Sequence, residues 1–185
     1  MAVYYLKKGK SPETLPYSII PVSDDDPLII IDRYKPIILN ESANNSIEPA
    51  VIASIIYTES RGNSEAQRYL SRGDYVYGLM QMRLSTAVLE LNYSGKTANL
   101  LLPSVNISLG TRYLAKLRDK YRSIVDAISA YNQGTPAKND DGTYKNQQYV
   151  NAVINLIVVY RKAFLALFPD YFSLFWIDPI KELEV

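Results

Sequence analysis

The sequence contains no histidine and no cysteine among its 185 residues. Their absence excludes a serine or cysteine nucleophile that histidine activates. It also excludes a zinc site with His or Cys ligands, an iron–sulfur centre, a thiol redox pair and a disulfide framework. An enzyme of this composition must move protons through carboxylates, tyrosines or lysines, and we expect it to use no metal and no cofactor.

The sequence also lacks an excess of charge and a long hydrophobic run. Twenty Lys and Arg residues balance 19 Asp and Glu residues, so the net charge of +1 gives no electrostatic footprint for nucleic acid. The first residues, MAVYYLKKGK, are basic, but no apolar segment follows them, and we see no signal peptide. The longest apolar run, near residues 150–160, is too short to cross a bilayer. We therefore expect a soluble protein without a membrane span.

What the sequence has in abundance is tyrosine, with 16 residues beside 4 Phe and 1 Trp. Tyrosines commonly fill partly solvent-exposed positions at the edge of a core. Several could instead line a groove for a polymer, because an aromatic face with a polar tip suits sugar rings. Composition alone favours the first interpretation. The length fits one domain, which at this size buries roughly 70% of its unfolded surface.

The distribution of prolines, charged residues and aromatic residues divides the chain into three regions. Residues 1–27 contain four prolines and an acidic run, which favours an extended N-terminal arm. Residues 28–168 form the predicted domain, and residues 169–185 form an aromatic tail that either packs back on the domain or docks a partner. We predict a mainly α, single-domain protein with little strand signal outside the arm.

Helical periodicity and capping residues suggest the main elements. Pro36 is a plausible first residue of a short helix, and Asn44, Asn45 and Ser46 offer capping oxygens for the next one. Further helices are expected over 103–121, with Ser104 as a candidate cap, and over 123–133, ended by Gly134. Residues 147–168 read as a long helix, apolar nearly all round and so central in the core.

One helix places an acid on an apolar stripe. In SIEPAVIASIIYTESRG, Val51, Ile55 and Glu59 are spaced by four, and Gly62 follows as a helix-ending residue. Burial and the negative end of the helix dipole would both raise the pKa of Glu59, which would keep it protonated as a general acid. Alternatively, the last helical turn emerges into solvent and leaves Glu59 at the surface.

Three short motifs, each at an expected helix end, share a recognisable order. They are Glu59-Ser60, then Gly78-Leu79-Met80-Gln81 with Thr86-Ala87, then Ala130-Tyr131-Asn132. Ile47-Glu48-Pro49, the stretch from Leu102 to Ile107 with Gly110 and Tyr113-Leu114, and Tyr149-Val150 with Val153 extend the pattern. Over roughly residues 36–160 the chain resembles the lytic transglycosylase (SLT) domain of the goose-type lysozyme-like superfamily, similar to glycoside hydrolase family 23.

The resemblance implies a lysozyme-like helical domain that cleaves the β-1,4 bond between N-acetylmuramic acid and N-acetylglucosamine in peptidoglycan. Glu59 would act first as acid and then as base, and would leave a 1,6-anhydro end. Ser60 would hold the end of the catalytic helix, and Tyr149 would orient Glu59. Met80 and Gln81 would line the sugar groove, and Tyr131 and Asn132 would contact acetamido groups.

Some positions depart from the family pattern. The serine that contacts substrate is matched only by Ser71, and the usual Pro after the GLMQ motif is replaced by Leu84. Goose-type lysozymes have an Asp where this chain has Arg83, so a hydrolase that activates water would need another second carboxylate. Asp74 and Glu65 are the nearest candidates in sequence.

Two other functions therefore remain open: a goose-type lysozyme or chitinase-like hydrolase, and a non-catalytic glycan-binding virion or structural protein. The expected place of action is the bacterial cell wall, in the periplasm or outside the cell. Without a visible signal peptide or lipidated cysteine, we expect delivery by other means, for example as a bacteriophage lysin or a virion-associated protein. Its N-terminal arm or C-terminal tail would then contact a virion or envelope partner.

Overall fold

The computed structural model describes residues 4–8, 17–21, 26–71 and 73–168. Side chains are described for 26–70 and 73–168. The helices are α1 (Ile29–Asn45), α2 (Pro49–Ser60), α3 (Leu84–Leu91), α4 (Pro103–Tyr121), α5 (Ile124–Gln133) and α6 (Gln147–Leu167), with a 3-10 helix, η1 (Thr97–Leu101). The strands are β1 (Tyr4–Lys8), β2 (Tyr17–Pro21), β3 (Gln67–Ser71), β4 (Asp74–Tyr77) and β5 (Met82–Arg83). The fold is mainly α, as predicted.

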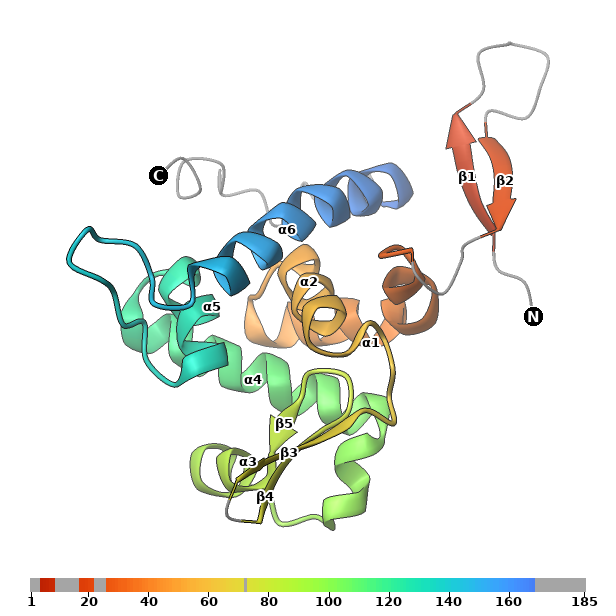
Figure 1. Ribbon diagram of the computed structural model, residues 1–185. Helices are drawn as coiled ribbons and strands as arrows, with labels where there is room; N and C mark the ends of the chain where they lie inside the picture. Colours follow the sequence, from red (N-terminus) through yellow and green to blue (C-terminus); the bar gives the residue numbers. More distant parts are fainter. Residues whose placement is uncertain (1–3, 9–16, 22–25, 72, 169–185) are drawn as a thin grey trace.

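Helix α2 lies in the middle of the domain. Its residues from Pro49 to Tyr57 are all buried, because the segment is apolar or small on every side. It packs against α6 and α1, and α4 packs against α1 and α5 (Figure 1). The main hydrophobic core therefore forms around α2, whose C-terminal end reaches the functional site.

Helix α6 was expected at the centre of the core, and this expectation is wrong. It buries one stripe, made of Val150, Val153, Ile157, Tyr160 and Phe164. Val158 and Val159 are 46% and 42% exposed, so its apolar character continues on the outward side. A helix that packs on one neighbouring layer buries one face, however apolar the other is.

One helix bears on the prediction that the chain has no membrane span. In the described part of the chain, α6 meets the length and hydropathy of a span, with a mean hydropathy of 1.6 over 18 residues. The prediction considered only the longest apolar run, near residues 150–160, whereas the helix extends beyond that run at both ends. A core helix passes the same test, and α6 supplies part of the core here.

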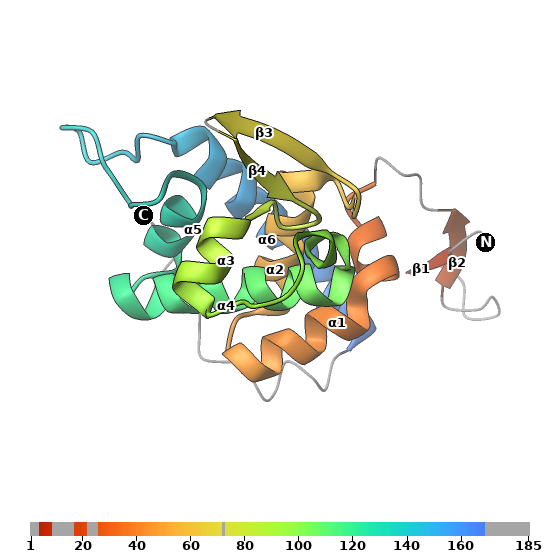
Figure 2. The ribbon, with the colours of Figure 1, turned by 90° about the horizontal axis from the view of Figure 1, so that it is seen from below.

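A three-stranded antiparallel sheet, in the order β3-β4-β5, was missed in the sequence. Its strands are short, and the pairing of β3 with β4 is irregular between Tyr69 and Ser71, so no clear alternation marks them. The sheet lies with α3 at one side of the helical layer (Figures 1 and 2). The domain is thus less purely helical than the periodicity suggested.

Helix boundaries agree with the sequence where a glycine or a proline marks them. α4 begins at Pro103 and α5 is followed by Gly134 with a φ of 89°, as expected. Ser104 is not a cap, since extended Leu102 precedes Pro103 at the first helical position. The predicted caps at Asn44 to Ser46 are also wrong, because α2 starts after Glu48.

Helix α1 begins seven residues before the predicted start, at Ile29, and Pro36 lies inside it. A proline removes one backbone hydrogen bond from a helix interior, which is normally costly. Ile30, Ile31 and Ile38 are nonetheless almost fully buried on either side of it. Burial of this apolar face offsets the lost hydrogen bond, which is why propensity alone placed the boundary wrongly.

The N-terminal region contains an antiparallel strand pair, β1 with β2, in which the register pairs the backbone of residue Tyr5 with that of Ile20. The predicted extended arm therefore includes a two-stranded ribbon. The tail 169–185 lies outside the described residues.

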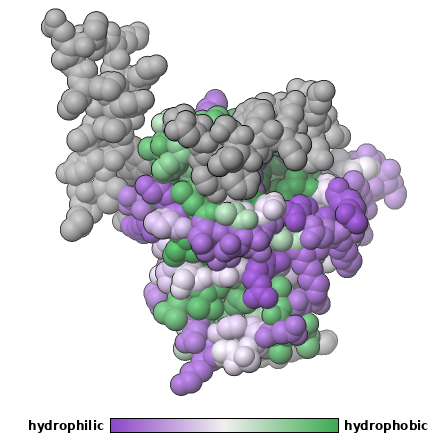
Figure 3. Space-filling view, turned by 180° about the vertical axis from the view of Figure 1, so that it is seen from behind, coloured by the Kyte–Doolittle hydropathy of each residue, from purple (hydrophilic) through white to green (hydrophobic). Residues whose placement is uncertain are grey.

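Seen from behind, hydrophilic residues cross the middle of the domain, with hydrophobic patches between them (Figure 3).

Candidate active site

The end of α2 presents Glu59 to a pocket. The helix closes at Arg61, which has a left-handed φ of 54°, and Gly62 follows with a φ of 80°. The Ser60 hydroxyl lies 2.8 Å from the Leu79 carbonyl oxygen and 3.1 Å from that of Ile56. Ser60 therefore ties the helix end to the GLMQ turn, and it does not line the pocket.

Glu59 is half-buried and hydrogen-bonded, so the alternative of a surface carboxylate is wrong. The Tyr149 hydroxyl donates to Glu59 Oε1 at 2.7 Å. Burial raises the pKa of Glu59, while the Tyr149 hydrogen bond and the positive charge of Arg68 oppose that rise. The net pKa shift is upward, which is the direction expected from the sequence.

The GLMQ motif forms a tight turn between β4 and β5 and does not stand at a helix end, which corrects the sequence interpretation. Gly78 has a φ of 70°, and a Cβ there would lie 2.7 Å from the Leu100 carbonyl oxygen and 2.6 Å from the Asn106 amide. Only glycine fits that position. Gln81 also has a positive φ, of 47°, and its amide donates to the carbonyls of Gly78 and Ala66.

Asn106, fully buried on α4, holds this turn in place. Its side chain accepts from the Met80 amide at 2.6 Å and donates to the carbonyls of Tyr77 and Leu100 at 2.7 and 2.6 Å. One turn of helix later, Gly110 leaves room for the Met80 side chain, since a Cβ there would lie 2.4 Å from the Met80 sulfur. These contacts explain why an Asn and a Gly lie one turn apart on the face of α4 toward the GLMQ turn.

The C-terminal end of α5 supplies Tyr131 and Asn132. The Tyr131 hydroxyl donates to the Met80 carbonyl at 2.9 Å, and its ring lies 5.6 Å from that of Tyr113, centroid to centroid. Burial, and then the nearby charge of Glu59, hold the pKa of Tyr131 well above its ordinary value. It therefore stays a hydrogen-bond donor. Exposed Asn132 accepts from the Asn146 amide at 3.0 Å.

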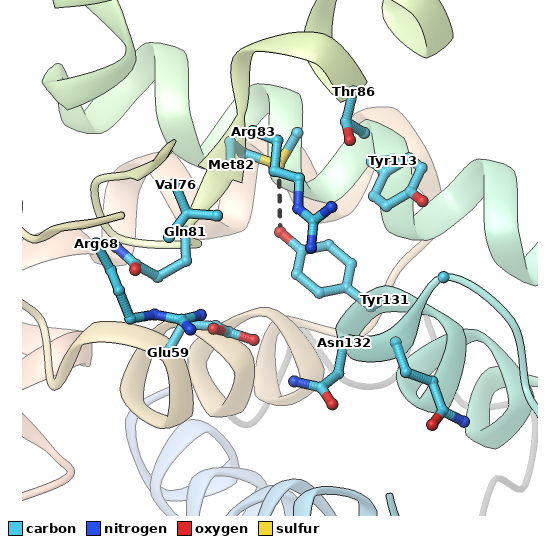
Figure 4. Close-up of a pocket in the computed structure, with 12 residues that line it drawn as sticks. Glu59, Arg68, Val76, Gln81, Met82, Arg83, Thr86, Tyr113, Tyr131 and Asn132 are labelled. Atoms are coloured by element: carbon cyan, nitrogen blue, oxygen red, sulfur yellow. Dashed lines mark hydrogen bonds between the residues drawn. The ribbon is translucent and has the colours of Figure 1, made fainter. Parts of the chain in front are cut away.

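These elements enclose one pocket, shown in Figure 4. Its lining residues come from α2, all three strands of the sheet, α3, α4 and α5, and are Glu59, Arg68, Val76, Gln81, Met82, Arg83, Thr86, Tyr113, Tyr131, Asn132, Gln133 and Gly134. Glu59 is the only carboxylate among them. The other lining side chains are mostly polar or aromatic, with Val76 and Met82 as the aliphatic ones, and such a mixture is typical of a ligand-binding pocket.

The structure gathers four of the predicted site residues in the pocket, Glu59, Gln81, Tyr131 and Asn132, with Tyr149 bonded behind Glu59. Met80 was expected to line the groove, but its side chain is fully buried in the core. Its neighbour Met82 lines the pocket instead, because Met80 packs against Gly110. The side chain of Ser71 lies outside the described residues.

Neither candidate for a second carboxylate reaches the pocket. Asp74 begins β4, where its carboxylate accepts from the Tyr75 amide at 3.0 Å. Glu65 is exposed in the loop before β3. In the segments that the structure describes, no group of three or more acidic side chains could hold a metal ion.

Sequence reasoning missed the contributions of Arg68, Val76, Met82 and Tyr113 to the pocket. Three of these side chains come from the sheet that the periodicity did not reveal. In the sequence, Arg83 was noted only as a departure from the family pattern and Thr86 only as part of the motif that follows GLMQ. The presence of Arg83 in place of the lysozyme Asp was the one signal that pointed to this part of the pocket.

Comparison with known proteins places these residues in a family context. The family model described as Transglycosylase SLT domain matches residues 36–154, a stretch that contains the pocket residues from Glu59 to Gly134 and also Tyr149. The chain is 32% identical over 147 residues to a membrane-bound lytic murein transglycosylase C of Histophilus somni (strain 2336), covering 72% of this chain and 39% of the relative.

Two further matches are more distant. Membrane-bound lytic murein transglycosylase E of Buchnera aphidicola is 28% identical over 136 residues, covering 66% of this chain and 60% of that protein. The X-ray structure of an inactive mutant of lytic transglycosylase Slt from Pseudomonas aeruginosa superposes with a TM-score of 0.62 at 24% identity, covering 77% of this chain and 26% of that one. This last likeness shows a shared fold. The chain spans only 39% of the length of the Histophilus relative.

Proposed function

Since the chain belongs to the transglycosylase SLT domain family, we propose that it is a peptidoglycan lytic transglycosylase. It cleaves the β-1,4 bond between N-acetylmuramic acid and N-acetylglucosamine and leaves a 1,6-anhydro-muramic end. The observation that carries this proposal is Glu59, a half-buried carboxyl with a raised pKa and the only acid among the pocket residues.

The first step uses the protonated form of Glu59. Its carboxyl proton passes to the glycosidic oxygen, the bond from that oxygen to muramic C1 breaks, and N-acetylglucosamine leaves with a free 4-hydroxyl. Burial raises the pKa of Glu59, so a larger fraction of the enzyme carries this proton near neutral pH. The resemblance implies that the substrate's own acetamido group stabilises the positive charge at C1.

The second step uses the carboxylate that the first step leaves behind. It takes the proton from the muramic C6 hydroxyl, and the C6 oxygen bonds to C1 to close the 1,6-anhydro ring. Glu59 is then protonated again, and no water is consumed. The Tyr149 hydroxyl, 2.7 Å from Glu59 Oε1, stabilises this ionised intermediate state and fixes the carboxylate in place.

A hydrolase is the alternative, and the pocket favours the lyase over it. An inverting hydrolase needs a second carboxylate about 6.5–9.5 Å from the first to activate water. Among the described residues that line the pocket, none besides Glu59 is acidic. The resemblance implies that Arg83 stands where goose-type lysozymes have an Asp. A non-catalytic glycan-binding role is the third possibility, and the half-buried, hydrogen-bonded carboxyl of Glu59 argues against it.

Substrate contacts are assigned to the residues whose side chains face the pocket. Gln81, Tyr131 and Asn132 line it, and the Tyr131 hydroxyl is held by the Met80 carbonyl, which leaves the ring to contact sugar. Ser60 and Met80 act instead through the position of the GLMQ turn. Ser71 at the end of β3 remains a proposed substrate contact.

Mass spectrometry of digested peptidoglycan tests the reaction. We expect anhydro-muramic ends from the wild type, and a loss of at least about 10³-fold in the Glu59→Gln variant, because one residue supplies both acid and base. Reducing muramic ends would establish a hydrolase, and binding without release a non-catalytic protein. Chitin oligomers, digested in parallel, distinguish the two substrates.

The place of action is proposed from the substrate, which is the bacterial cell wall, reached in the periplasm or from outside the cell. Residues 1–27 or 169–185 would dock a virion or envelope partner. The test is deletion of each segment: assembly and wall degradation that stay unchanged after both deletions would contradict docking.

A further inference from the structure

Two arginines stand in one row of the small sheet. The register pairs Arg68 of β3 with Val76 of β4, and Val76 with Arg83 of β5. Residues paired across a sheet share a face, and here all three line the pocket. Neighbouring strands lie about 4.8 Å apart, so the backbones of the two arginines are separated by roughly 10 Å.

Figure 4 shows how the two side chains divide the pocket. Arg68 reaches toward Glu59, whereas Arg83 extends from the other side of Val76 toward the ring of Tyr131. Burial raises the pKa values of Glu59 and Tyr113; the positive charge of Arg68 opposes the rise at Glu59, and that of Arg83 opposes the rise at Tyr113. Arg83 is therefore the cation on the side of the pocket away from the acid.

The charged side chains that line this pocket do not neutralise one another. Its lining residues contribute two guanidinium groups and one carboxyl, Glu59, which burial holds toward its neutral form. In the described segments, neither Arg68 nor Arg83 makes an ion pair, whereas Arg161 and Arg118 each pair with a carboxylate. A guanidinium that faces a groove without a partner is suited to bind a carboxylate with two parallel hydrogen bonds.

We propose that Arg83, assisted by Arg68 across the row, forms a carboxylate-binding subsite that makes the enzyme specific for acidic glycans. This inference rests on the proposed function. In peptidoglycan the carboxylate has two sources: the lactyl group of a peptide-free muramic acid, or the stem peptide attached to it. A neutral polymer such as chitin offers neither, so the subsite discriminates against it.

The experiment compares three substrates that differ in the carboxylates they carry. They are peptide-free glycan strands, the same strands with their lactyl carboxylates amidated, and strands that retain their stem peptides. Wild type is compared with Arg83→Gln and Arg83→Lys. Arg122→Gln is the matched control, because it removes the same charge from an exposed position at the end of α4, outside the pocket.

For strands with free carboxylates, we expect Arg83→Gln to raise KM roughly 10- to 100-fold with little change in kcat, as the loss of a charged hydrogen bond does. Arg83→Lys should recover part of that loss. Amidated strands should show a high KM with the wild type and no further rise in the variant. The source is the lactyl group if peptide-free strands show the effect, and the stem if only peptide-bearing strands do.

Equal effects of Arg83→Gln on acidic and amidated strands would overturn the subsite. Binding is measured in parallel with the Glu59→Gln variant, with and without Arg83→Gln, by calorimetry with the same strands. If the wild type cleaves nothing, the proposed function fails, but the binding measurement still decides between a carboxylate subsite and none. Arg68→Gln is less informative, because Arg68 also acts on the charge of Glu59.

Discussion

Glu59 stands under opposed influences whose balance defines the site. Burial disfavours its charge, while the Tyr149 hydroxyl and Arg68 favour it. The proposed mechanism needs both forms within reach, because its acid gives a proton and takes one back in the same turnover. Burial alone would make a stable acid but a carboxylate too costly to form, and the partner groups limit that cost.

The raised pKa of Glu59 makes the stability of the folded chain depend on pH. Because burial raises the pKa of Glu59 above its unfolded value of about 4.5, the folded chain holds this proton more tightly than the unfolded one. The stabilisation from the bound proton is complete below the unfolded pKa and is lost as the pH rises through the folded pKa. Thermal melts should show Glu59→Gln melting above the wild type near pH 7, with the gain vanishing near pH 4. A constant difference at every pH would contradict this.

In the proposed mechanism Tyr149 is a positioning residue, and its removal has a distinct signature. Tyr149→Phe removes a hydrogen bond that lowers the pKa of Glu59, so that pKa should rise further and move the alkaline limb of the rate profile to higher pH. We expect kcat to fall roughly 10- to 100-fold with KM unchanged, because the carboxylate is less well oriented.

The control for that prediction is Tyr93→Phe, which removes a hydroxyl that donates to the Lys96 carbonyl and does not line the pocket. It should leave the profile as it is. A raised KM in Tyr149→Phe with an unshifted profile would instead indicate that Tyr149 contacts the substrate.

At the scale of elements, the turn between β4 and β5 depends on one side chain of another element. Asn106 satisfies three backbone groups of the loops around it, and Gly78 and Gly110 allow the close approach. A buried polar group left without a partner costs more than a hydrogen bond normally contributes. The turn is therefore rigid because α4 holds it, and not because of its own sequence.

Asn106→Ala tests this arrangement. We expect the free energy of unfolding to fall by about 2–4 kcal/mol, since three buried backbone groups lose their partner at once. Denaturant titration measures it, with Asn155→Ala on the exposed side of α6 as the control, expected within about 0.5 kcal/mol of wild type. Equal losses in the two variants would mean that Asn106 has no special part in the turn.

The elements themselves were predictable to different degrees. α4 and α5 follow from their periodicity and from Pro103 and Gly134, because these signals act within one helix. The sheet and the interior position of Pro36 did not follow. Short strands are stabilised by their neighbours, and a proline within a helix is tolerated only where packing offsets it.

At the scale of the molecule, α2 and α6 are joined at both ends. Tyr149 meets Glu59 at one end, and Arg161 forms a bidentate pair with Glu48 at the other, at 2.6 and 2.7 Å. Glu48 and Glu59 are 11 residues apart and Tyr149 and Arg161 are 12 apart. At about 1.5 Å per residue both spans are close to 17 Å, so the helices run antiparallel in register.

Arg161→Met tests the distant pair. We expect it to lower the free energy of unfolding by about 1–2 kcal/mol, because it leaves the half-buried Glu48 carboxylate without its partner. kcat should stay within about threefold of wild type, since Tyr149 still holds Glu59. Lys162→Met, at an exposed neighbouring position, is the control for both the denaturant titration and the rate assay. A loss of kcat without a loss of stability would contradict a purely structural role.

The sequence by itself determined that this chain has no histidine or cysteine chemistry, that the domain is mainly helical, and that Glu59 lies near the end of an apolar helix. Each of these depends on composition or on the spacing of residues within one segment. Only the tertiary structure decided that Tyr149 bonds Glu59, that Met82 and not Met80 faces the pocket, and that Arg68 and Arg83 share one row. Such facts depend on the pairing and packing of distant segments, which no local pattern records.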